Sequence, residues 1–296
     1  MTSVSLVLGS GGARGYAHIG AIEEIRRRGY DIVAVSGSSM GALVGGMYAA
    51  GKLTQYRDWV SSLNWMQVLR LLDFTLSRGA IRGDRLFVKL AELLENAPNI
   101  EELAIPFTAV VTDITRQKEI WFQRGSLLEA LRASAAIPGL FTPVERDGHL
   151  LVDGGVLNPL PIIPVVAAQA DLIIAVDLNM PEGCYGNLQW PETRFLERSG
   201  MSDDWPVADT QPESVTKHVL ASEKGIGGRL DILLNSVEVM QASLSEYKIA
   251  GYPPDLVIRI PKKICSFYEF HRAREVIEYG RLATREHMQE LERSAG

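Results

Sequence analysis

One short segment has the spacing expected of a catalytic serine. Residues 37–41, GSSMG, fit the pattern G-x-S-x-G, in which a serine lies on a sharp turn between a strand and a helix. An apolar stretch precedes the segment and a run of small residues follows it. Ser39 has glycines two positions before and after it, so we interpret it as a candidate nucleophile, with helix capping as the alternative. Ser36 and Ser38 are interpreted as turn or cap residues.

A second segment, GSGGARG at residues 9–15, follows a predicted strand and precedes a predicted helix. It lacks the G-K-[ST] of a P-loop and departs from the dinucleotide pattern, although Asp31 lies where a ribose contact is expected, so nucleotide binding stays open. The other use of such a loop is an oxyanion hole built from backbone N–H groups near Gly11, Gly12 and Ala13. Arg14 either reinforces this loop or is an ordinary arginine at a helix start.

A third segment, residues 149–161, places an aspartate directly after a short apolar strand. Asp153 is followed by two glycines, and a carboxylate at the carboxyl end of a strand lies where α/β sheets bind ligands. Two alternatives remain. Asp153 is also the residue expected to build an Asx turn before Gly-Gly, and Asp177 is a rival carboxylate at the end of another strand.

The elements around these three segments predict a layered α/β fold. Short apolar runs alternate with helical patterns along the chain, as they do in proteins of this class. The sequence predicts strands at residues 4–8, 32–35, 107–111, 120–122, 150–152, 171–178 and 255–260. It predicts helices at residues 17–28, 40–50, 54–76, 83–95 and 267–291. We expect one domain over residues 1–296, with a core at about 4–178, a mobile insertion at 179–214, and C-terminal helices with one strand at 215–296.

Composition and charge narrow the classes of function. The 296 residues are 46% hydrophobic and 22% charged, with a net charge of −6, so no basic footprint for nucleic acid is present. The N-terminus has no basic segment followed by an apolar run, and no stretch approaches the roughly 18 apolar residues of a membrane span. Cys184 and Cys265 show no metal or redox spacing and are expected to be free thiols. We expect a cytoplasmic protein; the sequence carries no signal for an oligomeric state.

The three segments together resemble those of the patatin-like phospholipases, particularly the short bacterial members. Residues 134–143, SAAIPGLFTP, add to the resemblance because they are similar to the family segment S-x-A-x-P-x-x-F-x-P, and the order and spacing match from residue 4 to residue 177. The resemblance implies a three-layer α/β/α sandwich with a mostly parallel central sheet. It also implies an acyl hydrolase with Ser39 as nucleophile and Asp153 as its base, using no metal or cofactor. The residues that it assigns to the oxyanion loop are Gly11, Gly12, Ala13 and Arg14.

The implied substrates are fatty-acyl esters, phospholipids or lysophospholipids, with possible peripheral contact to a membrane or micelle. Large apolar residues between Tyr56 and Leu76 predict a packed helix face, with an acyl-chain channel or a lipid-contacting face as the alternative. Three other hypotheses remain open. They are a Ser–His–Asp triad using His218, His271 or His287, a nucleotide-binding regulatory module, and a catalytically silent scaffold. His18 is expected to cap or pack rather than catalyse.

Overall fold

The computed structural model describes residues 1–71, 83–95, 98–180 and 226–295. Contacts divide the chain into two compact units, one of Met1–Pro181 with Glu238–Gly296 and the other of Glu182–Val237. All that follows concerns the first unit, and the prediction of a single domain over residues 1–296 stays a prediction. The expected mobile insertion at 179–214 falls outside the described residues, except that Asn179 and Met180 belong to a strand.

The central sheet has eight strands, most of them parallel, with the antiparallel pairs at one side. Its order is β5-β6-β3-β2-β1-β7-β8, and β4 pairs with β3 off this path. The strands are β1 (Ser3–Leu8), β2 (Asp31–Ser38), β3 (Phe107–Asp113), β4 (Lys118–Phe122), β5 (Val144–Arg146), β6 (His149–Asp153), β7 (Leu172–Met180) and β8 (Leu256–Pro261).

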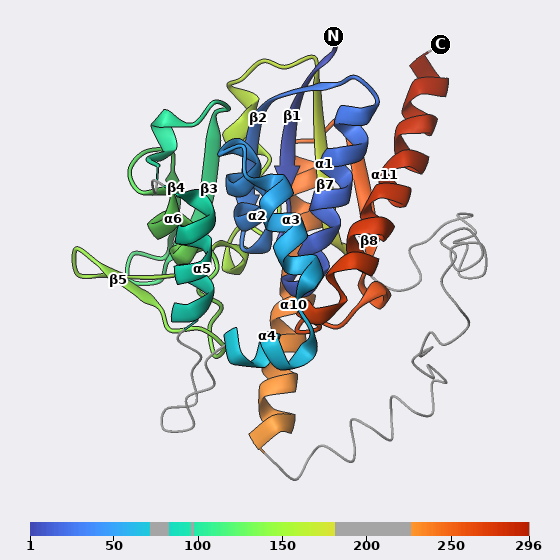
Figure 1. The fold of residues 1–296 in the computed structure, drawn as a ribbon. Helices are drawn as coiled ribbons and strands as arrows, with labels where there is room; N and C mark the ends of the chain where they lie inside the picture. The colour runs from blue at the N-terminus through green and yellow to red at the C-terminus, as the bar shows by residue number, and fades with distance from the viewer. Residues whose placement is uncertain (72–82, 96–97, 181–225, 296) are drawn as a thin grey trace, which may run out of the picture. The chain divides into compact units, whose positions relative to one another are not determined.

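Helices cover both faces of this sheet and form the outer layers (Figure 1). They are α1 (Ala17–Arg27), α2 (Met40–Ala49), α3 (Leu53–Ser62), α4 (Trp65–Leu71), α5 (Asp84–Leu94), α6 (Leu127–Ser134), α7 (Ile163–Val166), α10 (Ile226–Gly251) and α11 (Ala273–Ala295). Short 3₁₀ helices lie between these elements, including η1 (Gly12–Tyr16), η3 (Gly154–Val156) and η6 (Phe270–Arg272). The predicted three-layer α/β/α sandwich is therefore confirmed.

The core shows why the chain folds in layers. Val7, Ala34 and Ala175, from β1, β2 and β7, pack against Val165 of α7, and Ile249 of α10 packs on the same cluster. On the opposite face Gly45 of α2 lies close to Leu8, Val35 and Phe107. Because both faces are covered, the parallel strands are apolar on both sides, which explains their short continuous hydrophobic runs.

The ends of several elements differ from the prediction. The second strand runs on to Ser38 rather than stopping at residue 35, because the polar Ser36 and Ser38 pair with β3 as strand residues. The single helix predicted at 54–76 is two helices, α3 and α4, and residues 72–76 lie outside the described residues. Among the residues that the structure describes, no helix combines the length and apolar character needed to cross a membrane.

Candidate active site

Ser39 lies at the junction of β2 and α2, in a backbone conformation that is rare for a residue with a side chain. Its φ and ψ are 57° and −123°, and it is buried. Its hydroxyl makes no helix-capping hydrogen bond, so capping does not explain its place at this junction. Strain of this kind persists where the surrounding structure enforces it and is concentrated at functional sites. The geometry agrees with the strand–turn–helix arrangement expected of G-x-S-x-G.

The two glycines of this motif permit close backbone packing around Ser39. A Cβ atom on Gly37 would lie 2.4 Å from the carbonyl oxygen of Gly41. A Cβ atom on Gly41 would lie 2.1 Å from the carbonyl oxygen of Leu8. Both distances are shorter than any real contact, so neither position accepts a side chain while the turn keeps this form.

Ser134, the last residue of α6, links the turn at Ser39 to strand β3 by hydrogen bonds. The amide of Ser39 donates to Oγ of Ser134 at 3.0 Å, and that hydroxyl donates to the carbonyl oxygen of Val110 in β3 at 2.7 Å. Two residues further on, the carbonyl oxygen of Ala136 accepts the amide of Asp153 at 2.9 Å. The segment SAAIPGLFTP therefore ties the candidate serine to the candidate aspartate, a role that its spacing did not reveal.

Strand β3 sets the distance between these two residues through its register. Val110 of β3 pairs with Ser38 at the end of β2, and the next residue, Val111, pairs with Asp153 at the end of β6. Because β4 pairs along the whole of this part of β3, both β2 and β6 must lie on its other edge. The ends of β2 and β6 therefore meet there, and Ser39 and Asp153 come together although they are far apart in sequence.

Asp153 is a buried carboxylate with one oxygen that accepts a backbone hydrogen bond and one that has no partner among the described residues. Its Oδ1 accepts the amide of Gly155 at 2.7 Å, which is the predicted Asx turn. Burial raises the pKa of Asp153 to about 7, while hydrogen bonding with the Ser39 hydroxyl and the Gly155 amide opposes this rise. The Ser39 hydroxyl is thus close, but Oδ2 has no partner of ordinary hydrogen-bond geometry among the described residues. Such contacts often tighten only when substrate is bound.

The Gly-rich loop packs against the start of α2. A Cβ atom on Gly15 would lie 2.0 Å from Cγ of Met40, the residue that follows Ser39. The amide of Ala13 donates to the carbonyl oxygen of Phe267 at 2.8 Å, so it is not available to a substrate. The amides of Gly11 and Gly12 have no acceptor within the described part of the chain. Of the four residues predicted for the oxyanion loop, only these two glycines offer unused amides of this kind.

Arg14 is not an ordinary surface arginine. Its side chain is buried, and its Nη2 lies 2.6 Å from Oε1 of Glu238 on α10. One turn further along α10, Gln241 lies close to Gly155, because a Cβ atom on Gly155 would lie 2.6 Å from Nε2 of Gln241; Oγ of Ser10, from the Gly-rich loop, would lie 2.8 Å from the same atom. Helix α10 therefore contacts the Gly-rich loop and the aspartate turn. The sequence predicted helices within residues 215–296 but gave no bounds for this one and no contact with the site; the signal for that contact was the set of polar residues at helical spacing, Glu238, Gln241 and Ser245.

The other predicted residues have different environments. Asp177, the rival carboxylate, is buried but accepts the amide of Asn179 at 3.1 Å and lies 3.9 Å from Nη1 of Arg259. Burial raises the pKa of its carboxyl group. The prediction that Ser36 and Ser38 are turn or cap residues is wrong, because both lie in β2 and Oγ of Ser36 donates to the distant carbonyl of Pro161 at 2.5 Å.

No histidine in the described ranges hydrogen-bonds to Ser39 or Asp153. Nε2 of His18 lies 2.8 Å from the carbonyl oxygen of Gly9, and burial lowers the pKa of His18 to about 4. Nδ1 of His287 lies 2.8 Å from a carbonyl oxygen within its own helix, and His271 is exposed. His218 lies outside the described residues, as does Cys184; Cys265 is a buried free thiol.

The site as a whole combines a strained serine, a buried carboxylate with a raised pKa and two unused amides. Such a set can transfer a proton from a hydroxyl and stabilise negative charge on oxygen. Among the described residues, no group of three or more His, Cys, Asp or Glu side chains is placed to hold a metal ion.

Three comparisons with known proteins show what the chain is similar to. Residues 6–166 match the family model described as patatin-like phospholipase, a range that includes Ser39 and Asp153 and ends before α10. An uncharacterized NTE family protein of Mycobacterium tuberculosis is 40% identical over 325 residues, covering 95% of this chain and 90% of that protein. Neuropathy target esterase sws of Drosophila melanogaster is 37% identical over 185 residues, covering 60% of this chain and 13% of that protein. In the crystal structure of VipD from Legionella pneumophila, a chain superposes with a TM-score of 0.46 and 16% identity, covering 97% of this chain and 67% of that one.

Proposed function

The chain belongs to the patatin-like phospholipase family, and from this premise we propose that it is a serine acyl hydrolase that cleaves fatty-acyl esters of lipids. Ser39 is the nucleophile and Asp153 its general base. The family match and the esterase named among the relatives support ester hydrolysis. The observation that carries the assignment of residues is the environment of Asp153. This buried carboxylate has one oxygen without a partner among the described residues, and its pKa, raised by burial, is held down in part by hydrogen bonding with the hydroxyl of the strained Ser39.

Acylation begins when Oγ of Ser39 attacks the carbonyl carbon of the ester. Oδ2 of Asp153 accepts the hydroxyl proton as the new C–O bond forms. An aspartate in water, with a pKa of about 3.9, is a poor base for a hydroxyl group, but burial raises the pKa of Asp153 to about 7 and makes it a stronger one. The pair is also held in place before the substrate arrives, because Ser134, Ala136 and β3 fix both backbones.

The tetrahedral intermediate carries a negative charge on the former carbonyl oxygen. The amides of Gly11 and Gly12 are the donors that we assign to this charge, and the start of α2 adds its partial positive charge. Arg14 acts indirectly, because its ion pair with Glu238 holds the loop rather than the substrate. Removing one donor of this kind typically costs about 3–4 kcal/mol of transition-state stabilisation.

The intermediate collapses when Asp153 returns the proton to the leaving alcohol. Water then attacks the acyl group on Ser39, Asp153 takes a proton from that water, and the fatty acid leaves with Oγ of Ser39 reprotonated. Every step uses groups of this chain and water alone. The substrate class that we assign is the acyl ester of a phospholipid or lysophospholipid, in keeping with the family.

Labelling with a fluorophosphonate probe tests the nucleophile directly. We expect the wild-type protein to take the label and to cleave p-nitrophenyl butyrate, and Ser39→Ala to do neither while keeping its thermal unfolding temperature. Ser38→Ala is the matched control, since Ser38 is also buried beside the turn and should remain labelled. A wild type that takes no label and cleaves no ester would contradict the proposal.

The same assay separates the alternative hypotheses. Alanine at His218, His271 or His287 should leave ester hydrolysis within about twofold of wild type, because the proposed base is Asp153. A histidine variant that folds and has lost activity would point to a Ser–His–Asp triad instead. Nucleotide binding that survives Ser39→Ala, with no turnover of esters, would point to a regulatory module using the Gly-rich loop.

A further inference from the structure

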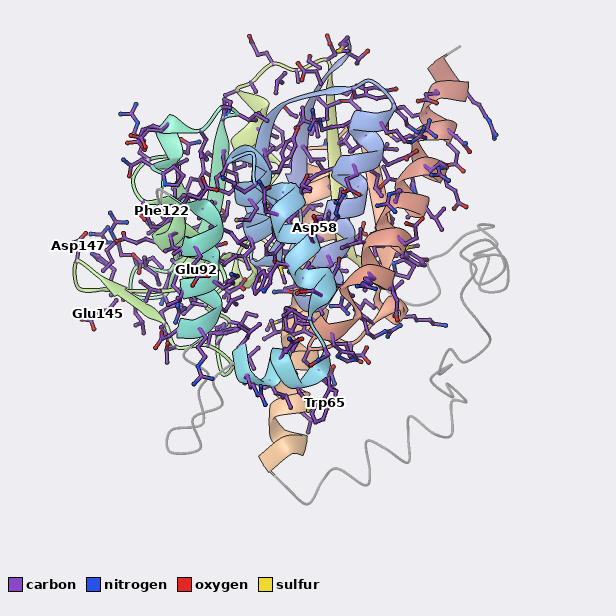
Figure 2. All side chains as sticks on the ribbon, viewed as in Figure 1. Asp58, Trp65, Glu92, Phe122, Glu145 and Asp147 are labelled. Carbon is purple, nitrogen blue, oxygen red and sulfur yellow. The ribbon has the colours of Figure 1, made fainter. Side chains whose placement is uncertain are left out.

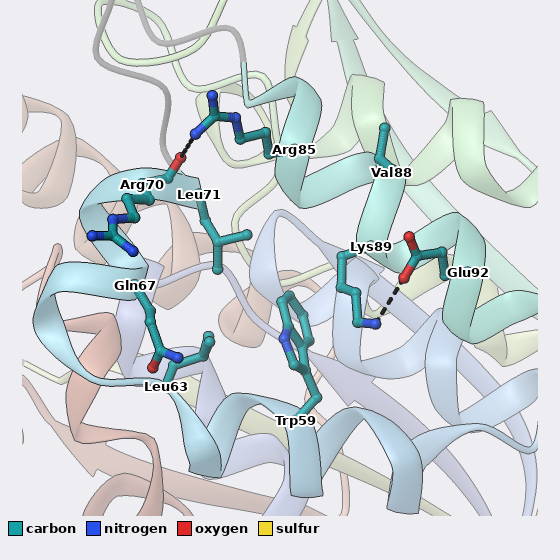
Figure 3. Close-up of a pocket in the computed structure, with 9 residues that line it drawn as sticks. All are labelled: Trp59, Leu63, Gln67, Arg70, Leu71, Arg85, Val88, Lys89 and Glu92. Carbon is teal, nitrogen blue, oxygen red and sulfur yellow. Dashed lines mark hydrogen bonds and ion pairs between the residues drawn. The ribbon is translucent and has the colours of Figure 1, made fainter.

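Two groups of side chains lie in surroundings that do not suit their chemistry. On α4 the apolar side chains of Trp65, Met66 and Leu69 are exposed, and Trp65 lies at the outer end of this helix (Figure 2). The predicted packed helix face therefore does not extend to α4, although Tyr56 of α3 is buried as expected. The pocket between α3, α4 and α5 (Figure 3) adjoins residues 72–82, which lie outside the described residues. The second group is polar, buried and described throughout.

This second group lies beside Asp153. Gln241 of α10 is 5% exposed and Ser10 of the Gly-rich loop is 1% exposed. Oε1 of Gln241 and Oγ of Ser10 have no hydrogen-bond partner among the described residues. A buried polar atom without a partner destabilises a fold, and an apolar side chain of similar shape would avoid this cost. The presence of these two polar side chains therefore needs an explanation other than stability.

Gly155 shows that both side chains converge on the carboxylate of Asp153. A Cβ atom on Gly155 would lie 2.6 Å from Nε2 of Gln241, 2.8 Å from Oγ of Ser10 and 3.0 Å from Oδ1 of Asp153. Three polar atoms from α10, the Gly-rich loop and the end of β6 therefore surround one point. A side chain at residue 155 would fill this point, so glycine lets the three polar groups approach one another.

Contacts made by other groups hold these elements together. The amide of Ser10 donates to the carbonyl oxygen of Pro159, which follows the aspartate turn, at 2.8 Å. One turn before Gln241 on α10, Glu238 pairs with Arg14 of the Gly-rich loop. The side chains of Ser10 and Gln241 are therefore kept near the carboxylate by contacts that do not use their own polar atoms.

Oδ1 of Asp153 is able to accept a further hydrogen bond at this point. It accepts the amide of Gly155 at 2.7 Å, and a carboxylate oxygen has two lone pairs, so one remains. A donor on Oδ1 favours the ionised carboxylate, whereas burial favours the protonated form. Such a donor also occupies Oδ1 and leaves Oδ2 for the proton of Ser39.

The elements packed around Asp153 and the Gly-rich loop also carry charged or titratable side chains. These are Arg14 and Glu238, which form an ion pair, Asp113 and His149, which lie 3.3 Å apart, Asp177, which lies 3.9 Å from Arg259, and Arg132, which donates to Thr142. The causes of the raised pKa of Asp153 are nevertheless burial, opposed by hydrogen bonding with the Ser39 hydroxyl and the Gly155 amide. A neutral donor such as the amide of Gln241 stabilises the ionised form without adding a charge.

We propose that Gln241 is a positioning residue for the general base: its side-chain amide, with the hydroxyl of Ser10 beside it, stabilises the ionised carboxylate of Asp153 at Oδ1. The inference rests on the proposed function, because it takes Asp153 as the base. Among the described residues, Gln241 and Asp153 approach without an ordinary hydrogen bond. Contacts of this kind often tighten when the substrate complex forms.

The pH dependence of hydrolysis tests this role. Gln241→Met keeps the length of the side chain and removes the donor, so the pKa of Asp153 should rise. We expect the midpoint of kcat/KM for p-nitrophenyl butyrate against pH to rise by about one unit, with the plateau at high pH within about threefold of wild type. At about pH 6 kcat/KM should therefore be roughly tenfold lower than in wild type. An effect on the fold alone would lower activity at every pH and leave the midpoint in place.

Thr284→Val is the matched control. Thr284 is also buried with a hydroxyl that lacks a partner among the described residues, but it lies on α11, which packs mainly against α1. Its midpoint should stay within about 0.2 units of wild type. Gln241→Glu is a second variant of similar shape, and a second carboxylate beside Asp153 should raise the midpoint at least as far as Gln241→Met does. Equal midpoints in wild type, Gln241→Met and Gln241→Glu would overturn the proposal.

Urea unfolding reports the same pKa without hydrolysis and so separates this proposal from the proposed function. An aspartate whose pKa is raised in the folded state makes the protein less stable as the pH rises toward that pKa. In Gln241→Met this loss should continue about one pH unit further, so the folding equilibrium constant should fall about tenfold more than in wild type between about pH 5 and 9. In an Asp153→Asn background the substitution should have no pH-dependent effect.

The two measurements can fail separately. A wild type that cleaves no ester, with the expected shift in unfolding, would contradict the proposed function and support the contact between Gln241 and Asp153. The same pH dependence of unfolding in wild type and Gln241→Met, or a difference that persists with Asp153→Asn, would overturn the role of Gln241 whatever the activity of the wild type.

Discussion

The two halves of the candidate site differ in how they are built. Ser39, the Gly-rich loop and Asp153 lie within residues 9–153 and carry recognisable patterns of residues. The contacts that hold them from the other side come from the C-terminal part, where Glu238 pairs with Arg14 and the carbonyl of Phe267 accepts the amide of Ala13. The first region has the groups that can react, and the second has none that the proposed reaction uses.

This difference follows from the physical nature of the two kinds of task. A strained serine turn or an Asx turn needs glycines at fixed positions near the serine or aspartate. Such a turn can therefore be recognised in the local sequence. Support across the site needs only a side chain of the right length at the right point in space, and many sequences provide one. Reactive groups should therefore tolerate no substitution, whereas supporting groups should show graded effects.

The largest effect expected in the first region is that of Asp153→Asn. The amide cannot accept the Ser39 proton as a carboxylate does, so kcat/KM for p-nitrophenyl butyrate should fall by roughly 10³-fold or more. Steady-state kinetics on the purified variant measure this loss. Asp177→Asn is the matched control, because Asp177 is also a buried carboxylate at a strand end but interacts with Asn179 and Arg259. Equal losses in both variants would contradict the assignment of the base.

The same substitution should stabilise the fold. Burial raises the pKa of Asp153 to about 7, above the value of about 3.9 for an exposed aspartate, so the folded protein holds an extra proton between these pH values. Its free energy of unfolding therefore falls as the pH rises from about 4 to 7, and the loss persists above 7. Asparagine cannot ionise, so Asp153→Asn should be about 2–4 kcal/mol more stable than wild type at pH 8 and equal to it near pH 4, as measured by urea unfolding.

The pattern of correct and missed predictions follows the same division. The strand–turn–helix around Ser39 and the turn at Asp153 were predictable because glycine spacing encodes them locally. The assignment of Gly11 and Gly12 to an oxyanion loop rests on the same kind of local glycine spacing and stays a prediction. That the amide of Ala13 is already bonded to Phe267 was not predictable, because this acceptor comes from a distant part of the chain. The extension of β2 through Ser38 was missed because only the pairing with β3 makes these serines strand residues.

The pH dependence of activity should be the next largest effect. Asp153 must be ionised to accept a proton, and its pKa is raised by burial to about 7. The fraction of enzyme in the active form therefore falls about tenfold for each pH unit below 7, and kcat/KM should be roughly 100-fold lower at pH 5 than on the plateau above pH 7. His18 should not contribute in this range, since burial lowers its pKa to about 4. A kinetic midpoint near pH 4 would contradict a buried base.

Ser134→Ala should give a smaller effect in the segment that connects the two reactive residues. The substitution leaves the buried amide of Ser39 without its acceptor, so the turn should loosen, with a loss of about 1–3 kcal/mol in stability and roughly 10- to 100-fold in kcat. Ser36→Ala is the matched control, because Ser36 is also buried and also donates to a backbone carbonyl, but it does not contact Ser39. It should lose comparable stability and keep activity within about twofold. Equal losses of kcat would mean that Ser134 acts only through stability.

Glu238→Gln should give the smallest effect and tests the C-terminal region itself. Glutamine keeps the length of the side chain but removes the charge that pairs with the buried Arg14, whose side chain is only 3% exposed. Because an unpaired buried cation is costly, the free energy of unfolding should fall by about 1–3 kcal/mol. The Gly-rich loop should become less well positioned, lowering kcat about five- to tenfold with little change in KM, since the loop is proposed to bind the transition state.

Glu246→Gln is the control on the same helix. Glu246 pairs with Arg259 at the surface, so loss of this ion pair should lower the free energy of unfolding by less than about 1 kcal/mol and leave kcat unchanged. If both variants lowered kcat alike, the effect would come from the general stability of α10. The ion pair between Glu238 and Arg14 would then have no specific role in positioning the Gly-rich loop.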